Sequence, residues 1–221
     1  MEPLSPEVRE RLMAQLSARP APRRSDVVRR RALLLVAGAA PVVLAVVMRG
    51  VGRQGRSTGL VLASVVVASL VAALGTWWAV FPGRSTLGRP RPWLLASAAV
   101  IPVALLLFAV ATVAVWPEAR VVESFDARVH VPCVVMTLVL AAAPLGAMLF
   151  LARRSDPVEP AATGAALGAS AGTWAGVAMT LGCEYSDLFH LGVSHILPIV
   201  GLAAVGAVAG ARVVGLRRTR Q

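Results

Sequence analysis

The stretch TGLVLASVVVASLVAALGTWWAVF, residues 58–81, carries no charged side chain over its whole length. A helix needs about 20 consecutive apolar residues to cross the hydrocarbon core of a bilayer, so this stretch is long enough to span a membrane. Six such runs occur, none with Asp, Glu or Arg in its middle: residues 32–48, 58–81, 93–116, 132–152, 161–182 and 191–211. The sequence therefore predicts an all-α fold, a polytopic membrane protein with six transmembrane helices.

The overall composition agrees with a membrane protein. The 221 residues are 57% hydrophobic and have a mean hydropathy of +0.73, whereas a single soluble domain would carry more charge. The net charge of +11 comes from 22 basic residues, all of them arginine, against 11 acidic ones. Because the arginines lie at the ends of the apolar runs, we expect membrane lipids as their partners and no direct contact with nucleic acid.

The distribution of arginines predicts the orientation. If the N-terminus is cytoplasmic, seventeen of the 22 arginines lie on the inner side of the membrane and five on the outer side. Positive residues accumulate on the cytoplasmic side, so both termini are predicted to be cytoplasmic, in a bacterial inner membrane. The chain then divides into a cytoplasmic segment (residues 1–31), a six-helix bundle (32–211) and a basic cytoplasmic tail (212–221).

The segment GCEYSDLFHLGVSH, residues 182–195, gathers Cys183, the only tyrosine (Tyr185), His190 and His195. The predicted topology places it at the outer membrane face, together with Cys133 and His130. These six residues are candidates for a signal-sensing or disulfide site: His130, Cys133, Cys183, Tyr185, His190 and His195.

Several chemistries are open to this outer group. Buried cysteines and boundary histidines are common without a special role. A disulfide can join Cys133 and Cys183 if their α carbons come within about 7 Å. Thiols and imidazoles also suit Zn or Cu, with His130, Cys133, Cys183 and a histidine of the last run as ligands, but the spacing matches no strong metal signature, so no metal and no cofactor are predicted. A Cys–His enzyme is disfavoured because no acidic orienting group or oxyanion donor can be assigned.

Small residues predict how the bundle packs. Glycines recur every four residues in the fifth run, at Gly164, Gly168, Gly172 and Gly176, and again at Gly206 and Gly210 in the sixth. Such a stripe lets two helices approach closely. We expect packing within the chain, with a homo-oligomer seam as the alternative. Transporters usually place ionisable groups at membrane depth, and these runs offer no acidic or basic residue there.

The N-terminal segment LSPEVRERLMAQLSARPAPRR, residues 4–24, predicts a short amphipathic helix. Ser5 can cap it, with Pro6 at its first position. Val8, Leu12 and Leu16 line one face, with Met13 beside them. This apolar face either lies on the inner leaflet or docks in the groove of a partner.

Three features together resemble the NrsF-like family of membrane anti-sigma factors. They are the spaced leucines followed by PAPRR, the cysteine at 133 before PLGAMLFLARRSDPVEPAATGAALGASAG (144–172), and LGCEYSDLFHLGVSHILP (181–198). The likeness is clearest over residues 133–217. Size and layout are most similar to a light-responsive anti-sigma factor of carotenogenesis.

The resemblance implies a function. Such proteins hold an extracytoplasmic-function (ECF) sigma factor at the inner membrane and release it when a signal inactivates the membrane part. The sigma-binding region carries over to roughly residues 1–31, with Val8, Leu12, Met13 and Leu16, and the cysteine pair to Cys133 and Cys183. The zinc-type anti-sigma pattern HxxxCxxC is absent from the sequence.

The implied signal is light or another oxidative stress. Singlet oxygen would attack electron-rich side chains of the outer group and Trp116, or Trp77, Trp78 and Trp174 within the bundle. The expected outcome is control of carotenoid genes. A small membrane-embedded enzyme or transporter is the alternative function, and no catalytic residue is assigned.

Overall fold

The computed structural model describes Glu7, Glu10 and residues 24–49, 57–80, 90–116, 125–153 and 159–214. These residues form helices and their connections, with no strand among them, so the all-α prediction is confirmed. The elements are α2 (Arg24–Arg49), α3 (Thr58–Val80), α4 (Arg91–Val115), α5 (Ala127–Ala152), α6 (Pro160–Gly182), α7 (Leu188–His190), the π-helical turn η1 (Leu191–Ile196) and α8 (Leu197–Val213).

Four helical segments are long and apolar enough to cross a membrane: Thr58–Trp78, Arg91–Val115, Ala127–Ala152 and Leu188–Val213. The other two predicted runs, 32–48 and 161–182, are also helical but differ in character. In α2 the apolar part is the shorter stretch Ala32–Ala45, because the helix begins among polar residues at Arg24. In α6 alanine, glycine, serine and threonine predominate, and these small side chains lower its hydropathy.

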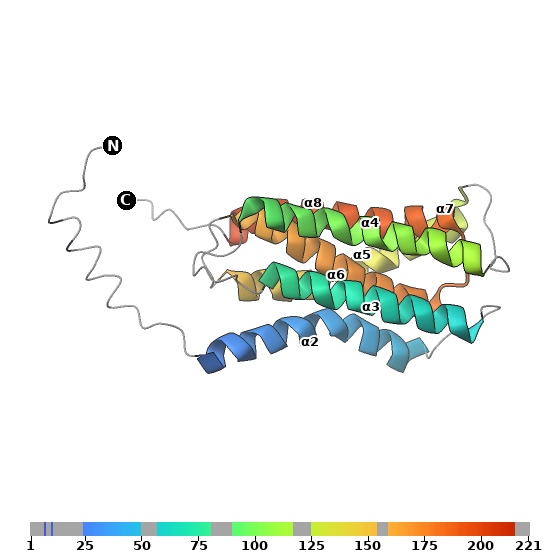
Figure 1. Ribbon diagram of the computed structural model, residues 1–221, viewed down its shortest axis with the longest axis horizontal. Helices are drawn as coiled ribbons and strands as arrows, with labels where there is room; N and C mark the ends of the chain where they lie inside the picture. The colour runs from blue at the N-terminus through green and yellow to red at the C-terminus, as the bar shows by residue number, and fades with distance from the viewer. Residues whose placement is uncertain are drawn as a thin grey trace.

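The helix α6 is the centre of the bundle. It contacts α2, α3, α4, α5 and α8, and nearly all of its residues from Ala162 to Leu181 are buried. Figure 1 shows the long helices running roughly side by side along the molecule. A helix enclosed on all sides faces other backbones rather than lipid, so small side chains suit it better than bulky ones. The surrounding helices instead carry exposed large apolar residues, such as Val47, Leu107 and Val115.

The backbones of α6 and α8 approach each other closely. A methyl group added to Gly164 would overlap the carbonyl oxygen of Gly206, and one added to Gly168 would overlap that of Leu202. A methyl group on Gly210 would likewise overlap the carbonyl oxygen of Pro160. Only glycine allows the two backbones to meet at these positions. The glycine stripe of α6 therefore faces α8 of the same chain.

A polar contact joins α3 to α6 inside the bundle. The indole Nε1–H of Trp174 donates a hydrogen bond to Thr76 Oγ1 at 3.0 Å. The Thr76 hydroxyl donates to the carbonyl oxygen of Ala72 at 2.8 Å and also contacts Ser170 Oγ. One hydroxyl can donate once and accept twice, so all three contacts are satisfied together. The network fixes Trp174 against α3 without leaving a polar atom unpaired at Thr76.

The two ends of the bundle differ. In Figure 1 the first turn of α2 and the last turn of α8 lie at one end, and α7 lies at the other. The short α7, the turn η1 and α8 form one continuous helical segment, Leu188–Val213. The cysteines and histidines singled out in the sequence lie at the α7 end.

Candidate functional site

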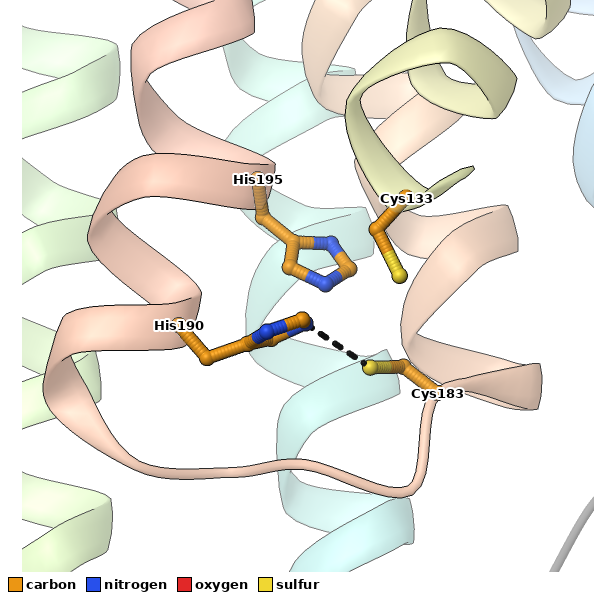
Figure 2. A group of neighbouring side chains, drawn as sticks. All are labelled: Cys133, Cys183, His190 and His195. Atoms are coloured by element: carbon orange, nitrogen blue, oxygen red, sulfur yellow. Dashed lines mark hydrogen bonds between the residues drawn. The ribbon is translucent and has the colours of Figure 1, made fainter. Parts of the chain in front are cut away.

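Four side chains converge at the α7 end of the bundle: Cys133, Cys183, His190 and His195, called here the Cys–His cluster. One donor atom from each side chain, the sulfur or one imidazole nitrogen, lies within 4.8 Å of the other three. Cys183, His190 and His195 are buried and Cys133 is partly buried. Figure 2 shows the two sulfur atoms and the two rings turned toward a common centre. The cluster therefore brings together groups from α5, the end of α6, α7 and η1.

Cys183 stands where α6 ends. Its backbone N–H bonds to the carbonyl oxygen of Met179 at 2.9 Å, and its extended backbone then leads the chain out of the helix. The sulfur lies 3.3 Å from Nε2 of His190 and 3.6 Å from the carbonyl oxygen of Tyr185. It is not bonded to the sulfur of Cys133. In this structure the two cysteines are thus a reduced pair held beside histidines.

His190 is positioned by a helix cap. Asp187 precedes α7, and its carboxylate accepts a hydrogen bond from the backbone N–H of His190 at 2.8 Å. A carboxylate at this N-cap position satisfies one of the amide groups that a helix start leaves without a partner. Both Asp187 and His190 are buried. The cap fixes where the helical segment begins. This start of the helix places the His190 ring beside Cys183.

The π-helical turn brings His195 to the same side as His190. Residues five apart in a regular α-helix point about 140° away from each other. In η1 the Leu197 N–H bonds to the carbonyl oxygen of Gly192, five residues back, and the two histidine rings lie 5.3 Å apart. Pro198 lacks an N–H and would clash with the carbonyl of Ser194 in a regular α-helix, which favours the wider turn at this point.

His130 and Tyr185 flank the cluster rather than joining it. The His130 ring is fully buried, and its Nδ1 lies 2.8 Å from the carbonyl oxygen of Asp126. Its centroid is 5.0 Å from that of His190, and the Tyr185 ring is 5.2 Å from His190. The metal-ligand set considered from the sequence used His130 and one later histidine, whereas the structure groups both His190 and His195 with the two cysteines.

Buried polar atoms remain without hydrogen bonds around the cluster. Among the described residues, Nδ1 of His190, Nε2 of His130 and Oγ of Ser194 have no hydrogen-bond partner. Most buried polar atoms in proteins do have one, so each exception calls for an explanation. The region is thus polar, enclosed and incompletely satisfied by the protein itself.

Two positioning features were missed in the sequence: Asp187 and the π-helical turn. Asp187 stands three residues before His190, which is the spacing of an N-cap and could have been recognised. The π-helical turn had only one signal in the sequence, the proline at 198. The tryptophans considered as oxidant targets lie elsewhere: Trp77 and Trp78 are exposed, and Trp174 is buried in the contact with Thr76.

The N-terminal candidates lie outside the described residues. Val8, Leu12, Met13 and Leu16 were predicted to bind the sigma factor. In that segment only Glu7 and Glu10 are described, and both are exposed.

Comparison with known families gives one match. Residues 16–215 match the NrsF family, described as "Negative regulator of sigma F". The match includes the whole Cys–His cluster and Leu16, whereas Val8, Leu12 and Met13 precede it. Neither the comparison with curated proteins nor that with solved structures gave a match.

Proposed function

The chain belongs to the NrsF family of negative regulators of a sigma factor, and from this premise we propose that it is an inner-membrane anti-sigma factor that sequesters an ECF sigma factor. The observation that carries the proposal is the family match over residues 16–215, which covers all of the long helices. The family name, a negative regulator of a sigma factor, supports a regulatory role with a sigma-factor partner over an enzymatic one.

We propose that all six long helical segments cross the membrane, with both termini in the cytoplasm. Four segments have the length and apolar composition for it. The enclosed position of α6 supports a crossing by that helix too, since its neighbours shield it from lipid. The start of α2 and the end of α8 lie at the same end of the bundle, as a cytoplasmic location of both flanking segments requires (Figure 1).

The sigma factor is held by the N-terminal segment in this proposal. An amphipathic helix with Val8, Leu12, Met13 and Leu16 on one face offers an apolar stripe that a groove of the sigma factor can bury. Docking of that stripe would keep the sigma factor at the membrane and away from RNA polymerase. The basic tail, residues 212–221, lies on the same side and contacts lipid headgroups.

The signal acts at the opposite end, on the Cys–His cluster. The reduced thiols of Cys133 and Cys183 lie close together, and oxidation converts thiols into polar or cross-linked products. Such a change would alter the packing of α5 and α6 against η1 at the point where they meet. Light, through singlet oxygen, or another oxidant would then release the sigma factor, and carotenoid genes are the proposed targets.

A double variant tests the sigma-binding segment. Leu12→Asp with Leu16→Asp places two charges in the apolar stripe, and burying an unpaired charge costs several kcal/mol. We expect target genes to be active without any signal, measured with a reporter, while the membrane level of the protein stays normal. Glu7→Gln with Glu10→Gln is the matched control, because these side chains are exposed, and it should still repress. Repression that survives the Asp variant in normally inserted protein would show that another segment holds the sigma factor.

A further inference from the structure

We propose that the Cys–His cluster is a tetrahedral binding site for one divalent cation of the Zn²⁺ type, with Cys133, Cys183, His190 and His195 as its ligands. The inference concerns metal binding by this chain and does not require that the proposed sigma-factor partner be correct.

The donor atoms and their spacing fit such an ion. Two thiolates and two imidazoles are a common ligand set for four-coordinate zinc. With metal–ligand bonds of about 2.0–2.3 Å, tetrahedral ligands lie roughly 3.3–3.8 Å from one another. Cys183 Sγ and His190 Nε2 are already 3.3 Å apart, and the four ligand atoms lie within 4.8 Å. A contraction of about 1 Å in the widest pairs would complete the site.

The charge balance favours a divalent ion. When M²⁺ binds two thiols and two neutral imidazoles, both thiols lose a proton, so two protons leave and the metal complex is neutral. A neutral complex suits a site in which three of the four ligands are buried, because an uncompensated charge is expensive there. A monovalent ion such as Cu⁺ would leave one negative charge in the same place.

The orientation of the buried His190 ring supports the same conclusion. The imidazole of His190 is fully buried. Its Nε2 faces the sulfur of Cys183, toward the centre of the cluster (Figure 2). A bound cation gives the converging sulfur and nitrogen atoms a common acceptor for their lone pairs.

The π-helical turn supplies a second, independent argument. Such turns are rare and occur frequently at functional sites. Here its effect is to place both His190 and His195 at one point, 5.3 Å apart by ring centroid, although five residues separate them. Pro198 favours the wider turn locally, and the convergence of the two histidines that the turn produces is what a metal site needs.

The test uses the full-length chain, purified in detergent and kept reduced without oxygen. Co²⁺ serves as the optical probe, because two thiolate ligands give sulfur-to-metal charge-transfer absorption and tetrahedral geometry gives intense visible bands. We expect one Co²⁺ per chain, displacement by Zn²⁺, and release of two protons per metal bound. Absence of thiolate absorption in the reduced parent protein overturns the proposal, as does binding of Cu⁺ alone.

Variants separate the four-ligand site from a site of two thiols. His190→Ala and His195→Ala should each weaken Co²⁺ binding by more than about 100-fold, since losing even an outer partner of a ligand costs about 10–100-fold. His130→Ala is the matched control, because this buried histidine lies beside the cluster without belonging to it. Equal affinity of the parent, His190→Ala and His195→Ala proteins would overturn the assignment of the histidines.

A conservative replacement guards against misfolding of the alanine variants. His195→Cys keeps a ligand at the same position, so it should still bind one Co²⁺, with stronger sulfur-to-metal absorption from the third thiolate. Loss of binding in a folded His195→Cys protein, shown by an unchanged thermal unfolding curve without metal, would contradict the proposed role of His195.

Discussion

Replacement of Gly168 by alanine is a direct test of the packing that holds the bundle together. The added methyl group would overlap the carbonyl oxygen of Leu202 on α8, and its next nearest neighbours are also backbone atoms. Backbone atoms cannot rotate away as a side chain can, so the two helices must separate locally. Gly201→Ala is the matched control, because Gly201 lies on α8 and a methyl group there meets nothing within 4 Å.

The magnitude follows from comparing the two variants. Both gain the roughly 0.5–1 kcal/mol that alanine contributes over glycine in a helix interior, so this gain cancels in the difference. What remains is the cost of overpacking at residue 168, typically about 1–3 kcal/mol. At about 2–4 °C per kcal/mol for a chain of this size, the Gly168→Ala protein should melt several degrees below the Gly201→Ala protein.

Thermal unfolding in detergent, followed by circular dichroism, measures this difference. If the two variants melt at the same temperature, the close approach of α6 and α8 at Gly168 is wrong. Gly164→Ala would then decide whether the whole glycine contact is misplaced, because its added methyl group would meet the carbonyl oxygen of Gly206.

Four further substitutions test other parts of the structure. Trp174→Phe removes the indole hydrogen bond to Thr76 and should lower the free energy of unfolding by about 1 kcal/mol, measured in the same assay; an unchanged stability would contradict the contact. Pro198→Ala allows a regular α-helix in place of η1, so Co²⁺ affinity should fall in optical titrations while the melting temperature of the metal-free protein is maintained. Unchanged affinity would show that the turn does not position His195. Cys133→Ser and Cys183→Ser should each preserve repression in a reporter strain but blunt its response to oxidant. A drop in membrane protein level with constitutive expression would instead indicate a structural disulfide, whose loss costs about 2–4 kcal/mol.

The sequence predicted the helices well because hydropathy reports contact with lipid. Each of the six apolar runs is helical, and the run at 161–182 coincides almost completely with α6. The beginning of α2 was missed by several residues, since its first turns, from Arg24 onward, carry polar side chains that hydropathy does not register. The central position of α6 could not be predicted from its own sequence, because small residues indicate close packing but do not identify every neighbour.

The site was predicted in part. Alternating topology was enough to gather Cys133 and Cys183 at one end with the histidines. Topology did not predict which histidines join the cysteines. That depends on a π-helical turn, and a regular helix would have separated His190 from His195. His130 was one of the candidate ligands from the sequence, and in the structure its ring packs between Phe125 and His190.

The most direct test of the account is recovery of a sigma factor with the intact membrane protein. The tagged full-length chain is purified in detergent from untreated cells and from cells exposed to light or oxidant, and the associated proteins are identified by mass spectrometry. We expect an ECF sigma factor in the untreated sample, in an amount comparable with the chain itself, and its loss after exposure. Purification of intact, folded protein without any sigma factor from untreated cells would contradict the central claim.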